Sequence, residues 1–464
     1  MSFQQATYRP SKNSDFAGNP FIESLPARLS QSEFWEATEH EIYVPDNLSE
    51  LDAETLEHKA GNIMKSVSPT PEYYDVYCDF LNTLKEGYQE RNPVHEDTVR
   101  WQNQVATSTF RATRTTAPSL KFTGFSGMGK TTLINSVLTL IPPVIEHPKD
   151  GPLKREMLQF VYLKIDIPSD ATSMEICLMI AAEIDKVKGT NYRTQYERLT
   201  RSLCINRVIT LCTSLLIGII IFDEIHNICF AAPNERKHIF TLFDQLTQVA
   251  KVPTVKIGTS KANRLAEKEF TNARRLGVPH EWKNYSKTDE SWKLLLEYAW
   301  NYQLLPKFVP LTPSIENKIY TITQGIPHCL FFLIEQANKH CIRKGIDQFS
   351  EDVLNFIFDT KFSLMRTALI ALRHNKLDAF DDLMTVNLQL DKEVKKMIKN
   401  LLKIADENRF TAEEAKAAYL AIEKHLPEYQ LTQKEQLIVK RLEKEAATDS
   451  KMTTDQHGYP EMPV

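Results

Sequence analysis

The stretch Gly124-Phe125-Ser126-Gly127-Met128-Gly129-Lys130-Thr131 decides the interpretation of the whole chain. It fits the phosphate-binding pattern G-x-x-x-x-G-K-[ST] at every position. Glycines let the backbone curl so that its N–H groups face phosphate oxygens, Lys130 adds a positive charge, and the Thr131 hydroxyl can bind magnesium. A short strand (Leu120 to Thr123) precedes the loop and an amphipathic helix (130–141) follows it, which is the context that the motif requires.

We therefore expect ATP and Mg²⁺ at this loop. The helix that begins at Lys130 directs its positive dipole end towards the phosphates. The motif predicts these nucleotide-binding residues, with Thr131 also as a metal ligand: Gly124, Ser126, Gly127, Met128, Gly129, Lys130, Thr131 and Thr132.

An acidic motif, Ile219-Ile220-Ile221-Phe222-Asp223-Glu224, lies downstream of the loop. Its apolar run is typical of a strand buried on both faces, and ligands bind at the carboxyl ends of such strands. Asp223 would hold the magnesium through water, and Glu224 would orient and activate the attacking water. The alternative is that the two acids only cap the next helix.

Three further residues are candidates for catalysis. Thr259 follows the strand 254–258, so its hydroxyl could lie between the acids and the γ phosphate; the alternative is a simple turn. Arg274 and Arg275 follow a charged helix and could act as an arginine finger on the ATP of a neighbouring subunit. The alternative for these arginines is the end of a surface helix.

Strands expected at 160–165, 215–222 and 254–258 alternate with helices expected at 173–187, 194–213 and 233–250. This alternation predicts an α/β fold: a P-loop NTPase with a parallel sheet flanked by helices, a small helical lid, and helical N- and C-terminal extensions. The expected division of the chain is an extended N-terminal arm (1–30), a helical N-terminal region (31–115), the α/β ATPase core (116–288), the helical lid (289–360), a charged helical C-terminal region (361–445) and a disordered tail (446–464).

Composition excludes several classes of protein. The formal net charge is −4, so contact with a nucleic acid must come from a local basic patch. The seven cysteines form no C-x-x-C pair, which argues against a zinc site and a disulfide framework and indicates a reducing cytosol. No signal peptide is evident, and the longest apolar run, 215–222, is far shorter than the ~20 residues that span a bilayer. We expect a cytoplasmic protein without a membrane partner.

Asp223-Glu224-Ile225-His226 also matches a helicase DExH box. However, the sequence lacks the Q-x-x-G-R-x-G-R motif of helicases, and no second α/β domain is predicted after residue 290. The short helical segment after the sheet is more typical of an AAA+ lid.

Over roughly residues 15–360 the chain resembles the AAA+ ATPase regulators of Tn-seven-like cut-and-paste transposons, the TnsC/TniB family. The resemblance is carried by the arm Asn19–Pro26, the strand Val161–Asp166 with Glu175–Leu178 after it, the motif Asp223–His226, the stretch Ile257–Ala262, and Ala273-Arg274-Arg275.

This resemblance implies a bacterial protein that assembles on double-stranded DNA as ATP-bound rings or filaments, hexamer-like or heptamer-like. It implies that the assembly takes a signal from a target-selecting subunit and licenses the transposase and its partner nuclease, so that a mobile element is inserted by DNA recombination. Hydrolysis would take the assembly apart. One departure is the lid stretch Gln324–Cys329, which lacks the arginine that many AAA+ proteins place there. His328 could substitute, although we expect a packed lid histidine instead.

The basic segment 186–193 is the best candidate for contacts with DNA phosphates, through Lys186, Lys188, Thr190 and Arg193. The alternative is a solvated basic loop. For docking of the transposase we consider an exposed Phe21-Ile22 pair on the polar arm and the charged helices of 361–445.

Two other functions stay open. An origin-loading or signal-transduction (STAND-type) ATPase of the same superfamily would carry a winged helix or a repeat domain after the lid, and neither is predicted for 361–445. A scaffold that binds ATP without hydrolysing it is disfavoured by the intact Lys130 and Glu224.

Overall fold

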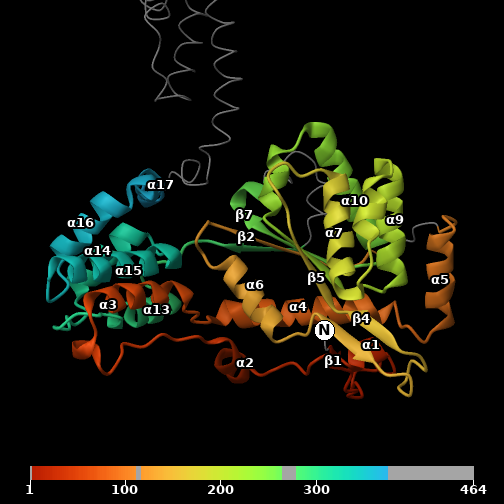
Figure 1. Ribbon diagram of the computed structural model, residues 1–464, viewed down its shortest axis with the longest axis horizontal. Coiled ribbons are helices and arrows are strands. Elements are labelled where there is room, and N and C mark those ends of the chain that lie inside the picture. Colours follow the sequence, from red (N-terminus) through yellow and green to blue (C-terminus); the bar gives the residue numbers. More distant parts are fainter. Residues whose placement is uncertain (1–2, 111–115, 264–277, 375–464) are drawn as a thin grey trace, which may run out of the picture. The chain divides into compact units, whose positions relative to one another are not determined.

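The computed structural model describes residues 3–110, 116–263 and 278–374. Within these residues the central sheet has five strands, all parallel, in the order β5-β6-β7-β2-β8 (Figure 1). The strands are β2 (Ser119–Gly124), β5 (Tyr162–Asp166), β6 (Ile219–Asp223), β7 (Thr254–Thr259) and β8 (Val278–Trp282). The last residue of β2, Gly124, lies opposite both Thr259 and Trp282, so the phosphate loop begins between the ends of two other strands.

The strand β6 is wholly buried, as its run of isoleucines predicts. It begins at Ile219 rather than at Leu215, because Leu215 is the C-cap of the preceding helix and Leu216 has a left-handed backbone with φ of 50°. The fully buried Arg91 donates hydrogen bonds to the carbonyls of Ile217 (2.6 Å) and Gly218 (3.1 Å) and so fixes the chain just before the strand.

The single strand predicted for 160–165 is two strands. β4 (Met157–Phe160) pairs with β3 (Val144–His147) in a second sheet, to which β1 (Gln4–Gln5) is added, while β5 belongs to the central sheet. Val161 is the junction: its N–H donates to Pro143 O (2.9 Å) and its carbonyl accepts from Ile219 N (3.1 Å). An unbroken stretch of strand-forming residues does not reveal where a chain passes from one sheet to another.

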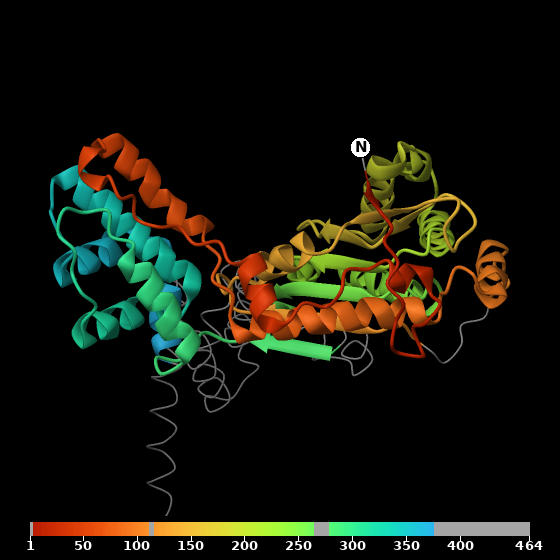
Figure 2. The ribbon, with the colours of Figure 1, turned by 90° about the horizontal axis from the view of Figure 1, so that it is seen from below.

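Helices cover both sides of the central sheet. α4 and α6 lie on one side, and α7, α9 and α10 on the other (Figures 1 and 2). The predicted helix 194–213 is interrupted because Thr200, with extended backbone, starts a new helix. These helices and their neighbours are α2 (Gln31–Thr38), α3 (Ala53–Ala60), α4 (Pro71–Gln89), α5 (Glu96–Ala106), α6 (Lys130–Thr139), α7 (Ser173–Lys188), α8 (Tyr192–Glu197), α9 (Arg201–Ser214) and α10 (Pro233–Gln248).

The N-terminal arm corrects one prediction. Phe21 and Ile22, on the short helix α1 (Pro20–Glu23), are 0% and 5% exposed. The ring of Phe21 packs against Tyr88 and His147, with centroids 5.3 and 5.1 Å apart. The prediction of an exposed pair that docks a partner is therefore wrong, because this apolar pair is buried in the chain's own core.

The helical lid follows the sheet and has its own hydrophobic core. That core also includes Ala60 and Ile63, whereas the apolar face of α4 belongs to the core of the sheet. The helical segment before the phosphate loop thus contributes to both cores. No helix in the described ranges is sufficiently long and apolar to span a bilayer. The lid helices are α13 (Glu290–Asn301), α14 (Pro313–Thr323), α15 (Pro327–Lys344), α16 (Glu351–Lys361) and α17 (Ser363–Arg373).

Candidate active site

The phosphate loop joins β2 to α6 and depends on two glycines with left-handed backbone. Gly127 has φ of 82° and Gly129 has φ of 84°. A Cβ at Gly127 would lie 2.9 Å from the Cβ of His328, and a Cβ at Gly129 would lie 2.9 Å from the hydroxyl oxygen of Tyr73. Both the backbone conformation and the available space therefore require glycine at these positions.

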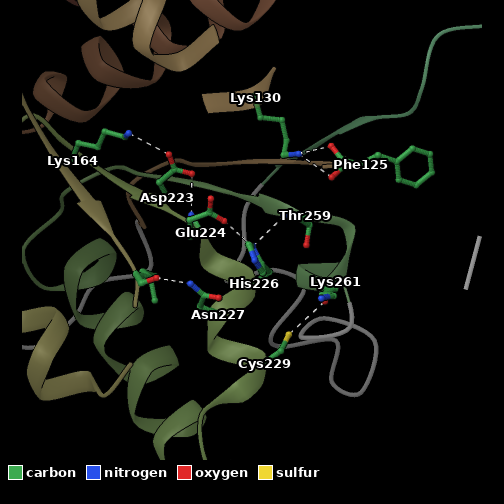
Figure 3. Close-up of polar contacts among 12 residues, drawn as sticks. Phe125, Lys130, Lys164, Asp223, Glu224, His226, Asn227, Cys229, Thr259 and Lys261 are labelled. Carbon is green, nitrogen blue, oxygen red and sulfur yellow. Dashed lines mark hydrogen bonds and ion pairs between the residues drawn. The ribbon is translucent and has the colours of Figure 1, made fainter. Parts of the chain in front are cut away.

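Lys130 starts α6 and bends back over the loop. Its ammonium donates to the carbonyls of Gly124 (3.0 Å) and Phe125 (2.7 Å) (Figure 3). Within the described chain no side chain caps the first N–H groups of α6, so these donors, the helix dipole and the ammonium together favour an anion.

The other predicted nucleotide-binding residues fall into two kinds. Ser126, Thr131 and Thr132 are exposed, so their hydroxyls are accessible to a ligand. The side chain of Met128 is 5% exposed and belongs to the lid core. Only the backbone of Met128 can therefore serve the nucleotide.

Asp223 ends β6 and is almost fully buried. Its Oδ1 accepts from the backbone N–H of Glu224 (2.9 Å), and its Oδ2 lies 3.2 Å from the ammonium of Lys164 (Figure 3). Lys164 also lies 3.5 Å from Asp166. A buried carboxylate requires such a counter-charge. Sequence reasoning missed Lys164; its signal was a lysine inside the apolar strand β5, next to the acidic strand.

Glu224 has an unusual backbone for a residue with a side chain, with φ of 56° and ψ of 34°. Strained conformations of this kind cluster at functional sites. Its Oε2 lies 3.1 Å from Nδ1 of His226, and the same Nδ1 lies 3.5 Å from the backbone nitrogen of Thr259 (Figure 3). One ring nitrogen cannot accept from an amide and donate to a carboxylate at once, so Nδ1 serves either Thr259 or Glu224, depending on whether it carries a hydrogen.

Thr259 is the last residue of β7 and is buried. Within the described residues its Oγ1 has no hydrogen-bond partner. An unpaired buried hydroxyl costs about 1–3 kcal/mol, which a hydrogen bond to a ligand would offset. A nucleotide bound at this edge of the sheet could supply the missing hydrogen-bond partner of Thr259 Oγ1.

The residues present fit a magnesium ion. The Thr131 hydroxyl and the Asp223 carboxylate are the oxygen ligands that Mg²⁺ prefers. Among the described residues no cluster of three or more His, Cys, Asp or Glu could hold a metal by itself.

The lid reaches the loop through its backbone. The N–H of His328, in the first turn of α15, donates to Gly127 O (3.1 Å). The side chain of His328 is exposed and its ring stacks on Phe332, so the expectation of a packed lid histidine is wrong. His328 is exposed because it lies in the first turn of α15, at the end of the lid that contacts the phosphate loop. Arg274 and Arg275 lie outside the described residues.

The four candidate DNA contacts do not form one free basic patch. Lys186 pairs with Glu183 (2.5 Å), and the guanidinium of Arg193 pairs with Glu175 (3.3 Å). The Thr190 hydroxyl donates to Asp185 (2.6 Å), while Lys188 is exposed at the end of α7. Contact of these residues with DNA stays a prediction.

Comparisons with known proteins found one matching family model and several similar solved structures. The sequence model of the AAA domain family matches residues 113–265, which contain the loop, the acidic motif and β7. A search of curated proteins found no match.

A search of solved structures found proteins of low identity to this chain, among them the following three. The ORC1 protein of Aeropyrum pernix in complex with DNA is 15% identical, with 75% of this chain and 82% of that chain covered and a TM-score of 0.37. The ORC of Drosophila bound to DNA is 12% identical, with 98% and 88% covered and a TM-score of 0.38. A RuvB variant of Thermotoga maritima is 13% identical, with 69% and 78% covered and a TM-score of 0.31.

Proposed function

We propose that this chain, which has the AAA+ P-loop NTPase fold, binds Mg·ATP on the loop 124–131 and hydrolyses it to ADP and phosphate. One observation carries this proposal. Asp223 and Thr259 end β6 and β7, Glu224 follows β6, and Lys130 follows the loop after β2, so all four lie at the carboxyl edge of three adjacent parallel strands (Figure 3).

Each group has a task in the proposed reaction. Lys130 exchanges its loop carbonyls for the β and γ phosphates, and the N–H groups of the loop bind the remaining oxygens. Thr131 and Asp223 hold the magnesium, which neutralises phosphate charge when bound. Glu224 accepts a proton from the attacking water. The hydroxyl of Thr259 donates to the γ phosphate or the water.

His226 has a positioning task in the same reaction. Its Nδ1 lies against the carboxylate of Glu224 and near the end of β7. It therefore restricts where the base points relative to Thr259.

The proposed biological role is to assemble on double-stranded DNA in the ATP-bound state and to link a target-selecting subunit to the transposase and its partner nuclease in cut-and-paste transposition. The resemblance of residues 15–360 to the TnsC/TniB family supports this role. In such an assembly Arg274 and Arg275 complete the ATP site of the neighbouring subunit, and Lys186, Lys188, Thr190 and Arg193 contact phosphates.

Negative-stain imaging tests the role, with and without a duplex of about 60 base pairs. The samples are the wild type in ATP, the wild type in ADP, and Glu224→Gln in ATP. We expect rings or filaments on DNA in ATP, more of them with Glu224→Gln, and few in ADP. A monomer that ignores DNA in every nucleotide state would exclude the transposition role and leave only an ATPase.

A charge substitution tests the DNA contacts. Alanine at Lys186 and Lys188 should weaken ATP-dependent binding to the duplex and lower the slope of log K against log salt by about 2. The matched control replaces Lys65 and Lys293, two exposed lysines on other elements, and should change neither quantity. Equal effects in both variants would mean that only net charge matters.

A further inference from the structure

A groove of about 730 Å³ lies away from the phosphate loop, between the lid helix α13 and the segments 35–44 and 68–71. Its volume falls within the roughly 300–1,000 Å³ of binding pockets. Aromatic and apolar side chains line it, including Trp35, Tyr298 and Tyr302. Two of its lining side chains, Tyr43 and Leu294, are 73% and 65% exposed, although they are large and apolar.

All the charged side chains that line the groove are acidic. Four glutamates line it (Glu39, Glu41, Glu290 and Glu297), and its lining contains no lysine, arginine or histidine. Burial and the neighbouring carboxylate of Glu41 raise the pKa of Glu39, as expected where like charges are held together. A cation in the groove would relieve this repulsion.

The groove is elongated and held by hydrogen bonds. Glu290, Leu294, Glu297 and Asn301 recur every three or four residues along one face of α13, a length of about 16 Å. The hydroxyl of Tyr298 accepts from Ile42 N (2.7 Å), which fastens the opposite wall to the helix. A preformed site of this kind binds without a large ordering cost.

We propose that this groove binds an extended cationic peptide segment of a partner protein. Lysine or arginine side chains of the segment face the four glutamates, and an apolar side chain packs between Tyr43 and Leu294. The length of the groove fits several residues of an extended chain. The same charges repel phosphates, so a DNA duplex does not occupy this face.

The test uses the full chain and fluorescence anisotropy. The probe is a labelled peptide that alternates Lys with Trp and Leu, and its partner probe has Glu in place of Lys. The groove variant carries Glu→Gln at 39, 41, 290 and 297. The matched control carries Glu→Gln at four exposed positions on other elements, Glu86, Glu96, Glu156 and Glu197, so both variants change the net charge equally.

We expect the wild type to bind the Lys peptide and not the Glu peptide. The groove variant should bind at least about tenfold more weakly, and the matched control within about twofold of the wild type. Leu294→Ala, which keeps every charge, should also weaken binding. Glutamine keeps the shape of glutamate and removes repulsion, so the groove variant should fold, and unchanged ATP affinity verifies this.

Four outcomes would overturn the proposal. The first is that the wild type does not bind the Lys peptide, and the second is that both quadruple variants lose equal affinity. The third is that spermine binds as tightly as the peptide, which would make the ligand a small polyamine. The fourth is that the groove variant alone changes the sedimentation mass without peptide, which would make another copy of this chain the occupant.

Discussion

The sheet and the lid each have a hydrophobic core, and the chain passes from the first core to the second between β2 and the phosphate loop. Phe122, in β2, lies in the core of the sheet, whereas Phe125, three residues later, lies in the core of the lid together with Met128. The motif leaves positions 125 and 128 open, and this chain fills both with apolar residues that pack on the lid. The chemistry thus comes from the sheet, while the lid supports the loop that binds the phosphates.

This division predicts a mechanical connection. Gly127 accepts a hydrogen bond from the first turn of α15, and its Cα has no room for a side chain against His328. A loop that moves to enclose phosphates must therefore move α15 or break these contacts. Substitutions in the sheet should change ATP hydrolysis, whereas substitutions between the loop and the lid should change how ATP binding affects the lid.

The largest effect is expected on ATP turnover, from a substitution at the edge of the sheet that leaves the lid unchanged. Glu224→Gln removes the proposed base and keeps its shape, so ATP turnover should fall by about 10²–10⁴-fold. ATP affinity should stay within a few-fold, because the phosphate donors are untouched. Phosphate release and titration with a fluorescent ATP analogue measure the two quantities. Unchanged turnover would remove Glu224 from the mechanism.

Lys130→Ala acts where the two regions meet. Loss of a charge-assisted contact to phosphate should weaken ATP binding by about 100-fold, or roughly 3 kcal/mol. The same titration measures the affinity. Lys188→Ala, an exposed lysine at the end of α7, is the control and should leave ATP affinity unchanged. ATP affinity close to that of the wild type in Lys130→Ala would contradict the proposed phosphate site.

A comparison of Phe122 with Phe125 distinguishes the roles of the two cores most clearly. Phe122→Ala and Phe125→Ala each remove a buried ring, so each should lower the free energy of unfolding by about 3–5 kcal/mol. Only Phe125→Ala should also weaken ATP binding in the folded protein, because it loosens the loop from the lid. Urea unfolding and ATP titration distinguish these effects. If both variants weaken ATP binding equally, the two cores are not separate supports.

Thr259→Val is expected to have the smallest effect. Valine has the same shape, and the unpaired buried hydroxyl is lost, so the free energy of unfolding without nucleotide should rise by about 1 kcal/mol. ATP turnover should fall by about tenfold, or 1.4 kcal/mol of transition-state stabilisation. Thermal unfolding and turnover assays check this. A loss of stability would show that the hydroxyl has a partner in the free protein.

Much of the fold was predictable from the sequence. The apolar run before Asp223 and the loop between strand and helix fixed the parallel sheet and the edge where the acids lie, because periodicity and motif spacing are local properties. The predicted helix 173–187 is confirmed as α7.

What the sequence did not reveal depends on contacts between distant segments. Burial of Phe21 against Tyr88 and the change of sheet at Val161 need partners about 60 positions away, which no local pattern encodes. The contact of Lys164 with Asp223 and that of His226 with the end of β7 likewise join residues that are separated in the sequence. A polar residue inside an apolar strand was the one available signal.

Hydrogen–deuterium exchange of Glu224→Gln, with and without Mg·ATP, tests most directly whether the phosphate loop links the sheet to the lid. The account predicts slower exchange in two places at once, the loop 124–132 and the first turns of α15 (326–332), with no change in α9. Slower exchange confined to the loop would contradict the account, because it would show that ATP binds without engaging the lid.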